Sequence, residues 1–100
     1  MLLFKRKFLP AIRCGEKTQT IRLWKRRMMR QGQRSYIPGV GAIHITAVEA
    51  VEIEALTDAD AVPDGFATAD ALRAELRSIY GERIAEGYQA FRVGFVRMAD

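Results

Sequence analysis

The chain has 100 residues, of which 49% are hydrophobic, and a formal net charge of +4 with one cysteine and one histidine. One cysteine cannot form an internal disulfide, and Cys14 with His44 cannot complete a four-ligand zinc site, so disulfide-stapled and zinc-structural folds are excluded. A chain of this length can bury roughly two thirds of its unfolded surface, so we expect one domain over residues 1–100. We expect neither a metal nor an organic cofactor.

The positive charge is concentrated near the N-terminus. Residues 1–34 hold eleven Lys and Arg residues against one acid, a balance of +10, whereas residues 35–100 hold five against eleven, a balance of −6. Two explanations stay open: an anionic ligand such as a polyphosphate, or a fold that places the acidic part beside the basic part. The apolar runs are far shorter than the ~20 residues of a membrane helix, and charges interrupt the N-terminal segment. We therefore expect a soluble, cytoplasmic protein.

The first third of the chain predicts short elements. Residues 1–4 are a candidate apolar strand. Residues 9–15 predict one or two helical turns, with Pro10 near the first position and Gly15 just past the end. Residues 17–24 predict a strand whose odd and even positions face opposite sides. Loops or turns are expected at residues 25–34, 36–41 and 62–66.

The rest of the chain predicts further strands and one clear helix. Residues 42–56 alternate apolar and polar positions except at Glu49, which predicts two strands or one strand with a bend or bulge at that residue. A short helical turn follows Thr57, and Thr68 caps the clearest helix, which Gly81 ends. Residues 88–98 predict a final strand. The pattern is α+β, with four to six strands around a sole core, and suggests a small, partly closed barrel.

The segment "GEKTQTIR" carries the pattern GxKxxxxR in Gly15, Lys17 and Arg22, and residues 64–66 and 80–81 read "DGF" and "YG" farther along. With these motifs in this order, the chain resembles the ASCH domain family of the PUA-like superfamily over most of its length. The resemblance implies an α+β PUA-like β-barrel of about five or six strands, with one main helix and one or two short helices.

The resemblance also implies a function. PUA-like domains typically bind RNA or modified nucleobases in a cleft beside the barrel. One bacterial branch resembles an amidohydrolase of N4-acetylcytidine that uses a lysine base, a threonine nucleophile and a glutamate proton donor. The matching positions are Lys17, Thr20 and Asp64, where the shorter aspartate stands in for the glutamate. Other members are linked to ribonuclease activity or coactivator complexes, so the family leaves the activity open.

The residues themselves support more than one interpretation. A threonine becomes a nucleophile only when a base takes its proton, and Lys17 can be that base only if burial or a cation such as Arg22 lowers its pKa. A nearby carboxylate of Asp64 would instead raise the pKa of Lys17. Strand alternation sends Lys17 and Thr20 to opposite faces unless Lys17 lies in the turn before the strand. Alternatively, Lys17 is a solvated turn residue and Arg22 an ion-pair partner of Glu52 or Glu54.

We predict a cleft that binds RNA, a nucleotide or a modified nucleoside. Trp24 could stack on a base while the neighbouring cations hold phosphates, or it could cover the end of the barrel beside a solvated basic loop. The alternatives are an amidohydrolase acting on an N4-acylated cytidine, with Lys17 as base and Thr20 as nucleophile, and a protein-interaction module with a basic face. The predicted catalytic residues are Lys17, Thr20 and Asp64, and the predicted ligand-binding residues are Gly15, Arg22, Trp24, Lys25, Arg26 and Arg27.

Overall fold

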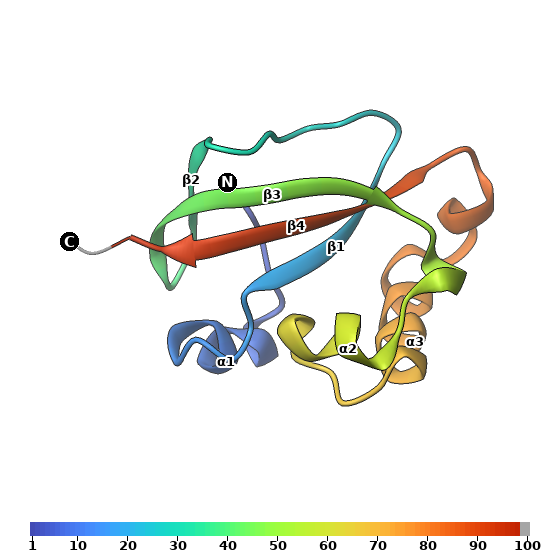
Figure 1. Cartoon of the computed structure of the whole chain (residues 1–100), viewed down its shortest axis with the longest axis horizontal. Helices are drawn as coiled ribbons and strands as arrows, with labels where there is room; N and C mark the ends of the chain where they lie inside the picture. Colours follow the sequence, from blue (N-terminus) through green and yellow to red (C-terminus); the bar gives the residue numbers. More distant parts are fainter. Residues whose placement is uncertain (99–100) are drawn as a thin grey trace.

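The computed structural model describes residues 1–98 and has an α+β fold, as predicted (Figure 1). Within these residues, no helix is long and apolar enough to cross a membrane. The helices are α1 (Leu9–Arg13), α2 (Asp58–Ala61) and α3 (Ala69–Tyr80), and the strands are β1 (Gln19–Trp24), β2 (Arg34–Ile37), β3 (Gly41–Val51) and β4 (Gln89–Arg97). Short 3-10 turns are η1 (Arg6–Phe8), η2 (Ile53–Ala55), η3 (Val62–Asp64) and η4 (Gly81–Ala85).

The four strands form one antiparallel sheet in the order β1-β4-β3-β2. The prediction of a partly closed barrel with five or six strands is wrong for the described residues: the sheet has four strands, and its edges β1 and β2 do not pair with each other. Residues 1–4 are not a strand, although the Leu2 N–H donates to the Tyr36 carbonyl of β2 at 3.0 Å. The sheet is therefore open, and β1 presents a free edge.

β3 is one continuous strand whose irregularity lies at Thr46 and not at Glu49. The pairing of β3 with β4 shifts by one residue at this point, which makes Thr46 the extra residue of a β-bulge. Before the bulge the buried positions are odd, at Ile43 and Ile45, and after it Val48 is buried. The change of face leaves Glu49 exposed, so the sequence pattern indicated a real irregularity three residues too late.

Two buried apolar clusters lie on opposite faces of β4, because its side chains alternate. One packs Phe91, Val93 and Phe95 against α1 through Ile12. The other contains Ala90 and the inward face of α3. The edge strand β1 belongs to the second cluster through Ile21 and Leu23, with Leu56, Ala61, Leu72 and Leu76. Helix α3 is thus held beside the free edge of the sheet.

The turn η3 brings the segment after α2 to the start of β1. The Thr18 N–H donates to the Pro63 carbonyl at 2.8 Å, which joins the two segments through their backbones. Gly65 ends η3 with a φ of 93°, a left-handed conformation that favours glycine. Lys17 and Asp64 are therefore neighbours in space although 47 positions separate them.

Asp60 ties α2 to the sheet. Its carboxylate accepts a hydrogen bond from the Thr57 N–H at 2.9 Å, completing a capping box, and another from Arg92 Nη1 at 2.8 Å. These hydrogen bonds, that from the Thr57 N–H foremost, lower the pKa of Asp60 below its ordinary value of 3.8.

We expect Asp60→Ala to lower the free energy of unfolding at neutral pH by about 1–2 kcal/mol, because a cap and a charged hydrogen bond are lost together. A carboxylate with a lowered pKa stabilises the fold above its ordinary pKa, and this stabilisation is lost as the pH falls through the lowered value. Urea denaturation of both proteins from about pH 6 to about pH 2 should show the difference shrinking. A constant difference would contradict this assignment.

Candidate functional site

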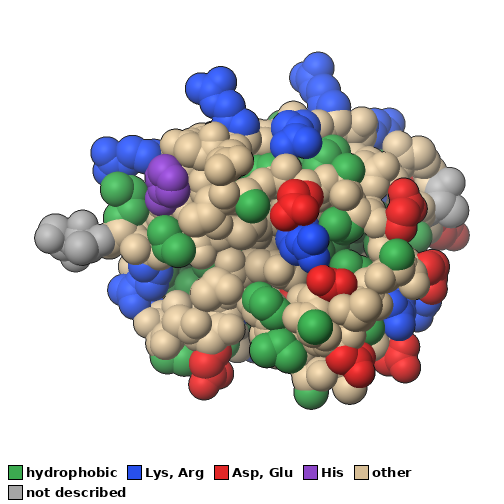
Figure 2. Space-filling model, in the orientation of Figure 1, with side chains coloured by type: hydrophobic (Ala, Val, Ile, Leu, Met, Phe, Trp, Pro, Cys, Tyr) green, Lys and Arg blue, Asp and Glu red, His purple; other side chains and the backbone are tan. Residues whose placement is uncertain are grey.

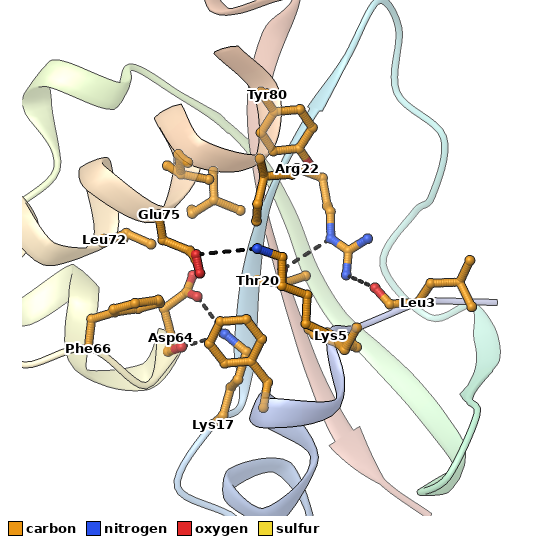
Figure 3. Close-up of a pocket in the computed structure, with 15 residues that line it drawn as sticks. Leu3, Lys5, Lys17, Thr20, Arg22, Asp64, Phe66, Leu72, Glu75 and Tyr80 are labelled. Atoms are coloured by element: carbon orange, nitrogen blue, oxygen red, sulfur yellow. Dashed lines mark hydrogen bonds and ion pairs between the residues drawn. The ribbon is translucent and has the colours of Figure 1, made fainter.

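A pocket of about 140 Å³ opens at the free edge of β1, between the N-terminal segment and α3 (Figure 3). A cavity of about 150 Å³ holds a benzene molecule, so this pocket has room for about one six-membered ring. Its walls are mainly apolar and aromatic. They comprise Leu3, Phe4, Lys5, Phe8, Lys17, Thr20, Ile21, Arg22, Asp64, Phe66, Leu72, Glu75, Leu76, Ile79 and Tyr80.

The pocket contains a buried ion pair between Lys17 and Asp64. Lys17 Nζ donates to Asp64 Oδ1 at 2.6 Å and also to the Asp64 backbone carbonyl, and each residue is 3% exposed. Gln19 Nε2 lies 3.4 Å from Asp64 Oδ2 and donates to it. Three aromatic rings surround the ammonium group, with centroids 5.0 to 5.7 Å from Nζ: those of Phe4, Phe8 and Phe66.

Burial acts on both members of this pair. It lowers the pKa of Lys17, while the charge of Asp64 opposes that effect. It also raises the pKa of Asp64, while the charge of Lys17 opposes it. Each charge therefore depends on the other, and desolvation pushes both residues toward their neutral forms.

Thr20 and Arg22 line the same pocket from β1. Lys17 can reach it too because β1 begins at Gln19, which leaves Lys17 in the preceding turn and outside the strand alternation. Arg22 Nε donates to Thr20 Oγ1 at 3.1 Å, and Arg22 Nη2 donates to the Leu3 carbonyl at 2.6 Å. The alternative role for Arg22, an ion pair with Glu52 or Glu54, is not found within residues 1–98.

A wider groove of about 520 Å³ lies next to the pocket, and Arg22 lines both. We call it the basic groove. Lys25 Nζ is 5.4 Å from the centroid of the Tyr88 ring, so a cation and an aromatic side chain are adjacent there. The groove is lined by Met1, Leu2, Arg22, Leu23, Trp24, Lys25, Arg26, Met28, Met29, Gln33 and Tyr88. Lys and Arg side chains also project from the edge of the molecule where the β1–β2 loop runs (Figure 2).

Two of the predicted ligand-binding residues lie elsewhere. Arg27 lines neither the pocket nor the basic groove: its Nη1 donates to the Val48 carbonyl at 2.8 Å, and its Cζ lies 5.6 Å from the Phe91 ring centroid. Gly15 also lies outside both, and its φ of 85° serves the turn between α1 and β1. Arg27 is thus an exposed residue that contacts the sheet through its guanidinium, Gly15 shapes the turn, and their roles in ligand binding stay predictions.

Three solved structures have a similar fold. The hypothetical protein PH0355 has a TM-score of 0.76 at 16% identity, covering 96% of this chain and 95% of its own. Protein EF3133 from Enterococcus faecalis V583 has a TM-score of 0.75 at 17% identity, covering 92% of this chain and 67% of its own. An ASCH domain from Lactobacillus crispatus JV V101 has a TM-score of 0.72 at 16% identity, covering 88% of this chain and 68% of its own. The protein has an ASCH-like fold.

At such identities the likeness shows the fold alone. No protein-family model matches the sequence, and no curated protein is significantly similar to it. The ASCH-like α+β fold that the segment "GEKTQTIR" implied is confirmed, except that the described residues form an open four-stranded sheet and not a barrel, and the roles of the segment's residues stay predictions. Within residues 1–98 of this ASCH-like chain, no group of three or more His, Cys, Asp or Glu side chains is arranged to hold a metal ion.

The sequence analysis missed Glu75, a pocket residue of α3. Its side chain is 10% exposed, and its carboxylate lies 2.6 Å from Lys7 Nζ and 3.7 Å from Lys5 Nζ. A signal existed in the sequence: Glu75 stands three positions after Leu72 and four before Ile79, within the apolar stripe of the helix. In the ASCH-like fold that stripe forms one wall of the pocket.

The ion pair can be tested by its effect on stability. We expect Lys17→Met to lower the free energy of unfolding at neutral pH by about 3–5 kcal/mol, because a buried carboxylate loses its partner. Without Lys17, the pKa of Asp64 would be raised further, so the loss should shrink as acid protonates that group. The double variant Lys17→Met/Asp64→Asn should regain at least half of the stability in urea denaturation. A double variant no more stable than Lys17→Met would contradict the pairing.

Proposed function

We propose that this chain binds one nucleobase of an RNA, a nucleotide or a modified nucleoside in the pocket, with adjoining phosphates along the basic groove. One observation carries the proposal: a pocket with room for about one ring, lined by aromatic side chains, continues past Arg22 into a cationic groove. Apolar walls with a few directed polar groups are typical of small-molecule sites.

The pocket offers both stacking surface and hydrogen-bond donors. The aromatic side chains of Phe4, Phe8, Phe66 and Tyr80 line it, and base–aromatic stacking contributes about 1–3 kcal/mol per base. A guanidinium has five N–H donors. Within the described residues, Arg22 uses donors on Nε and Nη2 for protein contacts, which leaves others for a base carbonyl or a phosphate.

The basic groove supplies the phosphate contacts in this proposal. Trp24, Lys25, Arg26 and Tyr88 line it and combine cations with aromatic rings, as in proteins that bind single strands. Contacts to phosphates position a nucleic acid without reading its bases. The pocket would therefore provide base selectivity, and the groove would provide affinity that depends on salt.

We expect Lys25→Gln/Arg26→Gln to weaken binding of short oligoribonucleotides by a similar factor for every sequence. The loss of two phosphate contacts should reduce the slope of log K against log salt by about 1.4, at about 0.7 per contact for a single strand. Titrations at several salt concentrations can follow the fluorescence of Trp24, the sole tryptophan.

Arg27→Gln is the matched control. It removes a neighbouring charge that lines neither cavity, so it should lower thermal stability and leave the salt slope nearly unchanged. An equal loss of affinity in Arg27→Gln, or none in the double variant, would refute the assignment of the groove.

Amide hydrolysis is a second candidate, favoured by the burial of Lys17 and Asp64 beside Thr20. If the proton moves from Lys17 Nζ to Asp64 Oδ1 along their 2.6 Å hydrogen bond, the pair becomes a neutral amine and a carboxylic acid. Desolvation favours that form. The amine could then take the Thr20 proton as the hydroxyl oxygen attacks an acyl carbon, and Asp64 could protonate the leaving amine. Water would later release the acyl group from Thr20.

Under this second candidate, we expect weak hydrolysis of N4-acetylcytidine. The Lys17 ammonium is engaged with Asp64, and Thr20 Oγ1 already accepts a hydrogen bond from Arg22, so the reactive arrangement is a minor state. Thr20→Val keeps the shape and should abolish turnover, whereas Thr20→Ser should retain it. Release of acetate and cytidine can be followed by chromatography. If the wild type binds the nucleoside without turnover, hydrolysis should be dropped and the binding function kept.

A further inference from the structure

Burial of the Glu75 carboxylate is unfavourable at its position in the fold. It lies on the inward face of α3 near Leu72, Leu76 and Ile79, and its side chain is 10% exposed. A carboxylate loses much of its hydration in such a place, and the loss must be offset by partners. Glu75 lines the pocket, where its carboxylate faces the amino group of Lys5, another lining residue (Figure 3).

The lysine partners of Glu75 outweigh this cost, because a hydrogen bond from Lys7 and the charges of Lys5 and Lys7 lower the pKa of Glu75 below its ordinary value of 4.5. The Lys7 and Lys5 side chains are 60% and 50% exposed, and such solvated ion pairs contribute little stability. Lys7 Nζ lies 2.6 Å from Glu75 Oε1 and donates to Oε2 at 3.5 Å, so both oxygens have a lysine partner. A carboxylate has about four acceptor sites, so Glu75 keeps capacity for a donor from a ligand as well.

We propose that Glu75 determines the specificity of the pocket by accepting an N–H from an amino group on the bound ring. The inference rests on the proposed function, since it names the ring that the pocket would select. An amino group can donate to an acceptor site of Glu75 that the lysines leave open. An oxo group would instead bring its oxygen against a carboxylate, which repels it and stays without a hydrogen bond.

Arg22, which lines the side of the pocket opposite Glu75, further limits which rings can match the pocket. Arg22 and Glu75 lie on opposite sides of the pocket with Thr20 between them (Figure 3). Arg22 offers donors and Glu75 offers acceptors, so a matching ring needs an acceptor at one edge and a donor at another. A 4-amino-2-oxopyrimidine has both, whereas a 2,4-dioxopyrimidine presents an oxygen at each of these positions. Carboxylates are known partners of the cytosine amino group.

The test compares cytidine 5′-monophosphate with uridine 5′-monophosphate, which differ in the amino or oxo group and in the N–H beside it. We expect the wild type to bind the cytidine form about tenfold or more tightly, the equivalent of one hydrogen bond to a charged group. Glu75→Gln can donate as well as accept, so it should bring the two dissociation constants within about threefold of each other. Glu75→Asp keeps the carboxylate and should keep the direction of the preference.

The lysines provide the control for a purely structural role. Lys5→Gln/Lys7→Gln removes the ion pairs and leaves the carboxylate, so it should preserve the cytidine preference even where affinity for the shared phosphate falls. If this double variant loses the preference as Glu75→Gln does, Glu75 is only a tether for the N-terminal segment and the inference is overturned. Thermal unfolding of each variant shows that the comparison is made between folded proteins.

The possible failures are distinguishable. Equal binding of both monophosphates by the wild type would overturn the role of Glu75, and so would an unchanged ratio of the two dissociation constants in Glu75→Gln. Either result would leave the proposal of a nucleobase pocket unaffected. If neither monophosphate and no oligoribonucleotide binds, the proposed function itself fails, and the role of Glu75 fails with it.

Discussion

The contact between Lys17 and Asp64 is the constraint on which the pocket depends. It joins the turn before the edge strand β1 to the turn after α2, and a backbone hydrogen bond from Thr18 to Pro63 reinforces it. Neither charge tolerates burial alone, so the two segments must stay together. Because α3 follows directly after this turn, the same contact sets where the helix stands relative to β1. The space left between them is the pocket.

The pair also sets the chemical character of that space. Its charges are satisfied internally and surrounded by aromatic rings, so they present little net charge to a ligand. The other charged groups that line the pocket include Arg22 on the strand and Glu75 on the helix, which differ in sign and come from opposite walls. A buried pair of this kind adds little to stability compared with apolar residues, which suits a role in positioning the site.

Local patterns predicted most elements because the signals were local. Thr57, Thr68 and Gly81 mark helix ends where they were expected, and the motif "GEKTQTIR" led to three residues of the pocket. The errors arose where contacts with a segment far away in the sequence determine the local structure. The count of strands failed because residues 1–4 meet β2 at one backbone hydrogen bond without joining the sheet. The hydrogen bond from Arg27 to the Val48 carbonyl is likewise a contact that its sequence neighbours do not indicate, while its role in ligand binding stays a prediction.

The sequence by itself determined the α+β class and most of the helices and strands, since these follow from periodicity and capping. The candidacy of Lys17, Thr20, Arg22 and Asp64 came from a resemblance to the ASCH family. Only the tertiary structure decided that the sheet stays open, that the pocket admits about one ring, and that Glu75 faces into it. The physical reason is that volume, burial and opposing walls are properties of segments far apart in the chain. Glu75 has an ordinary place in the sequence of a helix, and it acquires a role only because α3 packs beside the free edge of β1.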